Sequence, residues 1–387
     1  MILRQKYCPV SPILYKRIMK RFKKHLVLPL FLALQISATL HAADETTLLN
    51  QLSVINRNAA PSPSTQEEVP TFKEPKVSRV YGEVMGDYRI YVPKKTDLGL
   101  INLNAGGFQI VQELPRNFDE SFDMGGGGIR FGYVLLPGEN GALGKDFRLE
   151  FQGSSSYGEA DSSYAYDSQG VDIVTALRLD GSGTVDLENA NELTTRRDVE
   201  RTHIDIALNA KTDYAFSTGA FTATPLAGIR LIHENQDNRF TTEGILDGMS
   251  LKETIESYQV GPQVGFRVSC EVAKDMEIYV EPTAALLVSA NQYKGAQSFT
   301  NASANSVKDT ELEIAPRFAL TLGWRKHFGS FVLGVEGGAE YLINTAAVEY
   351  SSIAPGDSAL GTATAGTFLD AQDAYAGFMR LVLGYKF

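Results

Sequence analysis

The stretch Leu312-Glu-Ile-Ala-Pro-Arg-Phe-Ala-Leu-Thr-Leu-Gly-Trp-Arg325 alternates between an apolar phase and a polar phase. The charged residues Glu313, Arg317 and Arg325 all fall in the polar phase. Successive side chains of a β-strand point to opposite faces of the sheet, so a long run of period two indicates a strand with one apolar and one polar face. The sequence therefore predicts a long amphipathic strand over 312–325.

The same alternation recurs along the chain from about residue 79 to its end. Residues 331–343 repeat it after the short link 326–330, which predicts a hairpin. The other segments that alternate in this way are 79–92, 124–136, 146–159, 202–216, 221–234, 258–272, 278–290 and 375–387. We therefore expect ten strands.

The length of these segments distinguishes a membrane protein from a soluble β-sandwich. Strands in globular proteins commonly run about five or six residues, whereas a strand that spans a membrane needs about nine to eleven. Backbone groups in lipid must all be hydrogen-bonded, which strands achieve only in a closed barrel. The predicted fold class is all-β: a transmembrane antiparallel up-and-down β-barrel of about ten strands (10–12).

The predicted links between strands alternate in length. Short links fall near 137–145, 217–220, 273–276 and 326–330, and long polar links near 93–122, 160–200, 236–255, 291–310 and 345–373. Outer-membrane barrels have short periplasmic turns, long external loops and an even strand number. Both termini are therefore expected to be periplasmic. Residues 98–111 could form another strand, but this would break the parity, so we place them in the first external loop.

The last segment, from Tyr375 to Phe387, carries aromatic residues at both ends of its apolar face. Tyr375, Tyr385 and Phe387 are predicted to belong to the aromatic girdles at the membrane interfaces. A terminal aromatic residue preceded by alternating apolar residues resembles the C-terminal signature of outer-membrane proteins. That resemblance implies that Phe387 is part of an assembly signal read by the barrel assembly machinery.

The N-terminal region has the pattern of a targeting segment. Eight basic residues precede the apolar run 25–40, which is the order of a secretory signal peptide. We predict a signal peptide over 1–42, with Met19 as an alternative start, and Sec-dependent export to a Gram-negative outer membrane. A short membrane anchor is the alternative for this run. Residues 43–78 are expected to be a periplasmic segment with a flexible Pro-rich linker, and residues 79–387 the barrel.

Charge and cysteine content exclude several classes of function. Removing residues 1–42 takes away eight basic residues and no acidic one, so 36 basic against 46 acidic residues becomes 28 against 46, a net charge of −18. Such an excess of acid argues against nucleic acid as a partner. Cys8 is lost with the signal and leaves Cys270 alone, which excludes a disulfide framework and a cysteine-ligated metal site. No cofactor and no metal are expected.

The polar phase of the strands is predicted to face the barrel lumen and carries charges of both signs. These residues could line an aqueous channel and select ions by charge. Alternatively, Arg and Glu pair with one another and fill the bore, since eight strands barely leave room inside a barrel. The predicted lumen-lining residues are Arg130, Arg148, Glu150, Asp205, Arg230, Arg267, Glu281, Arg317, Arg325, Glu336, Glu340 and Arg380.

Four Gly- and Pro-containing segments, 258–266, 281–287, 315–324 and 334–341, together resemble the pore-forming major outer-membrane proteins of the Legionella type. The similarity extends over residues 79–387 and implies a β-barrel porin or a structural surface protein, not an enzyme. The family has paired cysteines that this chain lacks, which argues against a role in disulfide cross-linking.

One motif favours an enzyme. His233 is followed by Asn and Arg residues, which looks like part of the motif of outer-membrane phospholipases and lipid A deacylases. Those enzymes place a nucleophilic serine soon after the histidine, but here no serine follows until Ser250. We therefore predict a porin-like channel for ions and small polar solutes, in contact with outer-membrane lipid and lipopolysaccharide. A closed structural or adhesive barrel is the alternative, and a lipid hydrolase ranks last.

Overall fold

The structure is a computed structural model. It describes residues 80–92, 100–104, 110–113, 121–136, 145–166, 172–182, 184–187, 193–215, 221–243, 248–350 and 366–387. All of them belong to the compact unit Pro75–Phe387. The predicted signal peptide and the linker at 43–78 lie outside the described residues.

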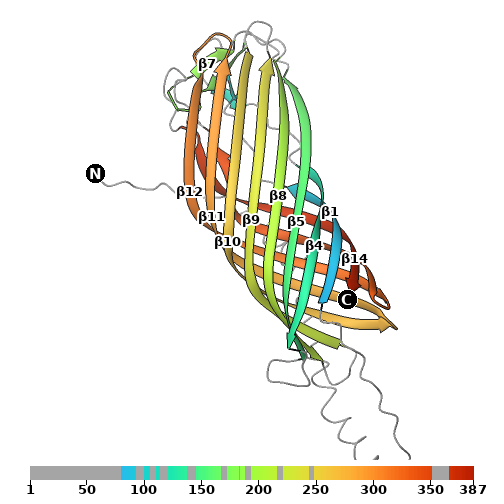
Figure 1. Cartoon of the computed structure of the whole chain (residues 1–387). Helices are drawn as coiled ribbons and strands as arrows, with labels where there is room; N and C mark the ends of the chain where they lie inside the picture. Colours follow the sequence, from blue (N-terminus) through green and yellow to red (C-terminus); the bar gives the residue numbers. More distant parts are fainter. Residues whose placement is uncertain are drawn as a thin grey trace, which may run out of the picture. The chain divides into compact units, whose positions relative to one another are not determined.

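Ten antiparallel strands form a closed ring, which confirms the predicted fold class (Figure 1). Neighbours in the ring are consecutive along the chain except where a small separate sheet intervenes, and β1 closes the ring by pairing with both β14 and β4. The barrel strands are β1 (Val80–Val92), β4 (Phe122–Leu136), β5 (Lys145–Tyr166), β8 (Leu193–Ala215), β9 (Phe221–Glu243), β10 (Gly248–Ala273), β11 (Met276–Phe299), β12 (Asn305–Phe328), β13 (Phe331–Glu349) and β14 (Phe368–Lys386). Each predicted strand coincides with one of them.

Eight of the strands extend six or more residues beyond their predicted ends. β10 has 26 residues, and β11 and β12 have 24 residues each. Only residues 244–247 separate β9 from β10, and only residues 300–304 separate β11 from β12. The prediction of long external links at 236–255 and 291–310 is therefore wrong. The outward face of these segments is polar and their inward face mixes polar residues with apolar ones such as Phe240 and Leu251, so the regular alternation that marks a strand disappears although the strand continues.

A second, four-stranded sheet lies outside the ring. It consists of β2 (Leu100–Asn104), β3 (Ile110–Glu113), β6 (Asp172–Leu177) and β7 (Thr184–Leu187), in the order β3-β2-β6-β7. Residues 98–111, predicted to lie in the first external loop and not in the barrel, contain β2 and the start of β3. Neither strand joins the barrel, so the even strand number predicted for the ring is retained.

Large apolar side chains are exposed on the outside of every barrel strand. Representative ones are Val84, Ile129, Phe151, Leu208, Ile229, Val264, Leu286, Leu320, Val335 and Leu381. They form a belt around the barrel, which we call the apolar belt. A soluble protein rarely exposes a continuous apolar surface of this extent, whereas the outside of a membrane barrel requires one. Among the described residues, no helix is long and apolar enough to cross a membrane.

We call the end of the barrel with the short links 216–220, 274–275 and 329–330 the turn end, and the opposite end the loop end. At the loop end, residues from five strands and from the segment after β6 pack into one apolar cluster. Its members are Leu179, Phe240, Leu251, Tyr293, Val348, Tyr350 and Leu369. The amide of Leu179 donates to Oε1 of Gln297 at 3.2 Å, and the amide of Thr367 donates to the carbonyl of Leu179 at 2.7 Å. The connection between β6 and β7 is thereby held against the mouth of the barrel.

Candidate functional site

The interior of the barrel is lined by charged side chains that face one another. Nearest the turn end, Glu83, Arg130, Arg325 and Glu336 form a closed group of four, which we call the turn-side ion cluster. Nη1 of Arg130 lies 2.6 Å from Oε2 of Glu83 and 3.0 Å from Oε1 of Glu336. Arg325 contacts the same two carboxylates at 2.8 and 3.0 Å. Each guanidinium therefore bridges two carboxylates.

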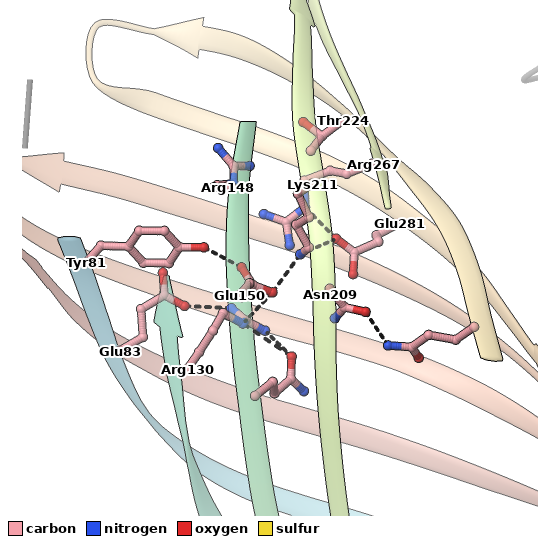
Figure 2. A network of polar contacts seen from close by, with 12 residues as sticks. Tyr81, Glu83, Arg130, Arg148, Glu150, Asn209, Lys211, Thr224, Arg267 and Glu281 are labelled. Atoms are coloured by element: carbon pink, nitrogen blue, oxygen red, sulfur yellow. Dashed lines mark hydrogen bonds and ion pairs between the residues drawn. The ribbon is translucent and has the colours of Figure 1, made fainter. Parts of the chain in front are cut away.

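Further ion pairs surround this cluster, as Figure 2 shows for one side of it. Nζ of Lys211 lies 2.7 Å from Oε1 of Glu150, and it also approaches Glu281 at 3.9 Å. Nε of Arg267 lies 2.7 Å from Oε2 of Glu281 (Figure 2). Positive and negative groups thus alternate around this part of the wall, so each of these charges has an opposite charge beside it.

Two tyrosines point inward and complete the coordination of the carboxylates. Tyr81 donates to Glu150 (Figure 2), and Tyr279 donates to Glu336. Each ring lies over a glycine of the adjacent strand: a Cβ on Gly132 would stand 2.1 Å from the Tyr81 ring, and a Cβ on Gly323 would stand 2.1 Å from the Tyr279 ring. Glycine is required at both positions because any side chain would displace the tyrosine.

A second group of charges, the loop-side ion cluster, lies one level nearer the loop end and consists of Arg89, Asp205, Arg230 and Glu340. Arg230 binds Asp205 on the adjacent strand at 2.7 Å and Glu340 at 2.9 Å. Nη1 of Arg89 lies 2.9 Å from the other oxygen of Glu340. All four side chains are buried, so the pairs are shielded from bulk water.

Beside the loop-side ion cluster, Glu234 contacts three different basic side chains. Nη2 of Arg317 lies 3.0 Å from Oε1, Nη2 of Arg201 lies 3.3 Å from Oε2, and Nδ1 of His203 lies 3.0 Å from Oε1. Arg317 also donates to Oε1 of Gln259 at 2.8 Å. These residues come from β8, β9, β10 and β12, so a single carboxylate connects distant parts of the wall.

Several of these ion pairs join strands that are not neighbours in the ring, and therefore reach across the lumen. Arg230 on β9 reaches Glu340 on β13, with β10, β11 and β12 between them around the ring. Arg130 on β4 reaches Glu336 on β13, with β1 and β14 between them. Contacts of this kind require the side chains to meet inside the lumen, so they occupy the space that a channel would need.

A small cavity remains between the two ion clusters. Its volume is about 60 Å³, and Asp205, Lys211, Arg230, Arg267 and Glu281 are among its lining residues. A buried water molecule needs about 10–15 Å³ on this measure, so the cavity has room for a few waters. It is much smaller than the pockets of roughly 300–1,000 Å³ that bind drug-sized ligands.

The structure places all twelve predicted lumen-lining residues inside the barrel. Most belong to the two ion clusters and their neighbours; Arg148 pairs with Asp213 at 2.7 Å, and Arg380 pairs with Asp87 at 2.9 Å. The predicted set omitted Arg201, whose guanidinium stacks 3.5 Å from the centre of the Tyr91 ring. It also omitted Tyr81 and Tyr279. Their place in the polar phase was the available signal, because an aromatic residue there has to point inward.

The predicted girdle residues lie on the outside of the barrel. Tyr375, Tyr385 and Phe387 have 45%, 38% and 69% of their surface exposed. Tyr385 contacts Phe331 and Phe387 edge to face, with ring centres 5.0 Å apart in both pairs. This aromatic group lies at the turn end, whereas Tyr375 stacks on Tyr341 at the other edge of the apolar belt.

His233 lies on the outward phase of β9 and does not face the lumen. Its ring stacks on Tyr258 with centres 4.5 Å apart. In the β9–β10 pairing Ser257 lies opposite Glu234, and Tyr258 lies opposite His233. The buried hydroxyl of Ser257 donates to Asn291 inside the barrel. The structure therefore brings no serine hydroxyl to the ring of His233 from this neighbouring strand.

One buried carboxyl belongs to the mouth, beyond the apolar belt. Glu253 is fully buried at the base of the apolar cluster, where Tyr293 donates to Oε1 at 2.6 Å and Tyr350 donates to Oε2. Burial raises the pKa of the Glu253 carboxyl above its usual range, against the opposing effect of the two tyrosine hydrogen bonds. The same surroundings raise the pKa of the Tyr350 phenol.

Comparison with known proteins gives only distant similarities. No family model and no curated protein match the chain. The outer membrane protease OmpT from Escherichia coli is similar at 10% identity over 81% of this chain and 98% of that chain, with a TM-score of 0.41. A FadL homologue from Pseudomonas aeruginosa is similar at 7% identity over 80% and 90%, with a TM-score of 0.23. The transport unit of the autotransporter AIDA-I from Escherichia coli is similar at 9% identity over 87% and 97%, with a TM-score of 0.22. Similarities this distant carry no conclusion about function.

Proposed function

We propose that this chain is an outer-membrane β-barrel whose interior is closed by ion pairs, and that it serves as a structural or adhesive surface protein without an open channel. The observation that carries the proposal is the set of contacts across the bore, above all Arg230–Glu340 and Arg130–Glu336. We place the turn end of the barrel and both termini on the periplasmic side. The loop-end parts of the long strands then extend beyond the outer face of the membrane.

The membrane location is supported by the outer surface of the barrel. The apolar belt is continuous around the ring, and aromatic residues such as Tyr375 and Tyr385 stand near its two edges. Ring closure leaves no unpaired strand edge at the level of the belt, as lipid requires. Together with the predicted export signal, these features favour the outer membrane of a Gram-negative bacterium.

The closed interior is supported by the energetics of buried charges. Removing one partner from a buried ion pair costs about 3–5 kcal/mol, so side chains paired on both sides have little tendency to swing aside. Most of these residues contact two opposite charges, as Arg130 and Glu340 do. The two ion clusters and the apolar cluster at the mouth lie one after another along the bore, so a solute would have to displace all three.

A porin-like channel for ions and small polar solutes is the second candidate. The resemblance to Legionella-type major outer-membrane proteins favours it, and the cavity between the ion clusters is lined by charges of both signs. On this hypothesis the ion pairs would have to open in the membrane. The acidic loops would then favour cations at the mouth, because fixed negative charge attracts them.

Recording from planar bilayers tests the proposal. The full mature chain is folded in detergent, and its fold is verified by the heat-modifiable shift on unboiled gels before insertion. We expect insertion without stepwise conductance, together with exclusion of small sugars in a liposome-swelling assay. Reproducible conductance steps from heat-modifiable protein would overturn the closed interior and favour the porin-like candidate. Failure of the folded chain to insert into bilayers would overturn the membrane location itself.

A further inference from the structure

A row of basic residues crosses the outer face of four adjacent strands beyond the apolar belt. Arg239 on β9, Lys252 on β10, Lys294 on β11 and Lys308 on β12 are all exposed and all point outward. The chain as a whole is acidic, with 46 Asp and Glu against 36 Lys and Arg. Four neighbouring positive charges on an acidic chain therefore suggest that this surface binds an anion.

The strand register places these side chains directly beside one another. Arg239 is the pairing partner of Lys252, and Lys294 is the pairing partner of Lys308. Lys252 pairs with Ala296, so Lys294 is its diagonal neighbour on the same face. Like charges directly opposite each other destabilise a sheet. Two such pairs side by side favour an anion that neutralises them.

The carboxylates on this face are engaged with other groups. Asp198 lies opposite Arg239 in the register and pairs with Arg196 at 3.1 Å. Asp237 accepts from Thr254 at 2.6 Å and from Asn235 at 3.1 Å. Glu256, the diagonal neighbour of Lys294 on β10, accepts from Tyr258 at 2.6 Å. Within the described strands, none of the three lysine ammonium groups has an ion-pair partner.

The position of the row relative to the belt fits the head groups of a membrane. Lys308 lies four residues beyond Leu312, which is 72% exposed, and Lys252 lies six residues beyond Tyr258. At about 3.3 Å per residue and a tilt of about 40°, this corresponds to roughly 10–15 Å above the belt. The polar head-group region occupies about 5–8 Å on each side of the hydrocarbon. Lysine side chains can reach down into it by extending their methylene stems along the surface.

On other strands, the outward positions just beyond the apolar belt carry acidic residues. Exposed carboxylates there include Asp123 on β4, Glu159 on β5, Glu200 on β8 and Asp373 on β14. The three lysines are gathered on β10, β11 and β12 with Arg239 at their border, and Asp237 and Glu256 lie between the row and the belt.

We propose that Lys252, Lys294 and Lys308 form a phosphate-binding site for the phosphorylated head group of lipopolysaccharide in the outer leaflet. The inference rests on the proposed outer-membrane location, because only there does the row face such a lipid. A phosphate between Lys294 and Lys308 accepts charge-assisted hydrogen bonds from both, and it removes their mutual repulsion. Lys252 is placed to contact the same phosphate or the next one on the lipid.

The test compares two double variants that each remove two positive charges. Lys294→Gln with Lys308→Gln alters the site, whereas Lys274→Gln with Lys326→Gln alters exposed lysines at the opposite, turn end, where Lys326 contacts the carbonyl of Lys274. Each full-length protein is folded in neutral detergent, and binding of purified lipopolysaccharide is measured by native mass spectrometry and by thermal shift. We expect binding about tenfold weaker or more for the site variant and unchanged for the control.

Further binding measurements identify the ligand and exclude misfolding as the cause of weaker binding. Enzymatically dephosphorylated lipopolysaccharide should bind the unaltered protein as weakly as the site variant binds the intact lipid, and Lys294→Arg with Lys308→Arg should restore binding. Competition by inorganic phosphate shows whether the free ion is sufficient. Equal loss in the two double variants, or equal binding of the dephosphorylated lipid, would overturn the phosphate site. If heat-modifiable protein inserts into bilayers in that case, the proposed membrane location stands although this inference fails.

Discussion

At the scale of single residues, we expect Glu253 to make the stability of the barrel mouth depend on pH. Burial raises the pKa of its carboxyl, so the folded state binds this proton more tightly than the unfolded state, where the pKa is about 4.3. The stabilisation is fully present below that value and is lost as the pH rises through the folded pKa. We expect the loop-end halves of β10 and β11 to exchange amide hydrogens increasingly fast as pH rises above about 4.3, after correction for intrinsic exchange.

The control is Glu253→Gln, which keeps the size of the side chain and remains neutral at every pH. In this variant the corrected protection of the mouth should no longer depend on pH, while protection of the membrane-spanning halves of the same strands should match that of the unaltered protein. Identical pH profiles in the two proteins would show that the carboxyl does not set the stability of the mouth.

A substitution at Gly132 tests how tightly the inward-pointing Tyr81 packs against the barrel wall. A methyl group there would stand 2.1 Å from the Tyr81 ring, so Gly132→Ala should move the ring and break its hydrogen bond to Glu150. Overpacking of this kind costs typically 1–3 kcal/mol. Urea unfolding in lipid vesicles, followed by the fluorescence of the single Trp324, measures the loss. Gly86→Ala, where a methyl group meets nothing within 4 Å, is the matched control and should show no loss of stability.

At the scale of strands, sequence alone could identify the parts that contact lipid. In 312–325 every second residue must be apolar because one face meets the membrane, and this demand leaves a visible period. Beyond the apolar belt the outward face is polar too, and β9 continues through Asn235-Gln-Asp-Asn-Arg239 with no alternation to detect. Lengths of 23 to 26 residues for β9 and β10 could therefore not be predicted. The hydrogen bonds to neighbouring strands maintain these extensions, and they depend on contacts distant in sequence.

The terminal strand β14 carries a prediction about assembly. Replacing Phe387 by Asp should lower the amount of folded barrel in the outer membrane and cause the protein to accumulate in the periplasm, because the resemblance of β14 to the signature of outer-membrane proteins implies that Phe387 serves both the girdle and an assembly signal. Cell fractionation with unboiled gels measures this. Phe328→Asp removes another exposed aromatic, 57% accessible at the end of β12, without altering the chain terminus. Equal yields from the two variants would assign Phe387 to the girdle alone.

At the scale of the whole barrel, the sequence identifies which charges face inward but not which of them meet. The phase of each strand assigns Arg230 and Glu340 to the lumen, yet they come from strands four places apart in the ring. Their contact depends on the stagger between strands and on the small diameter of a ten-stranded ring, which the pattern of a single strand does not contain. The choice between an open and a filled bore therefore required the three-dimensional structure.

A double-mutant cycle on this pair measures how strongly the opposite walls are coupled. Glu340→Ala leaves Arg89 and Arg230 without their shared carboxylate and should lower the free energy of unfolding by about 3–5 kcal/mol. Adding Arg230→Ala should cost less than it does alone, with a coupling of about 0.5–3 kcal/mol. The exposed pair Arg196–Asp198, whose side chains are 64% and 43% accessible, is the control, and its coupling should stay within about 1 kcal/mol. Salt should screen the control pair and leave the buried pair unchanged. A coupling near zero for Arg230 and Glu340 would mean that the ion pair does not brace the bore, and the closed interior would lose its main physical support.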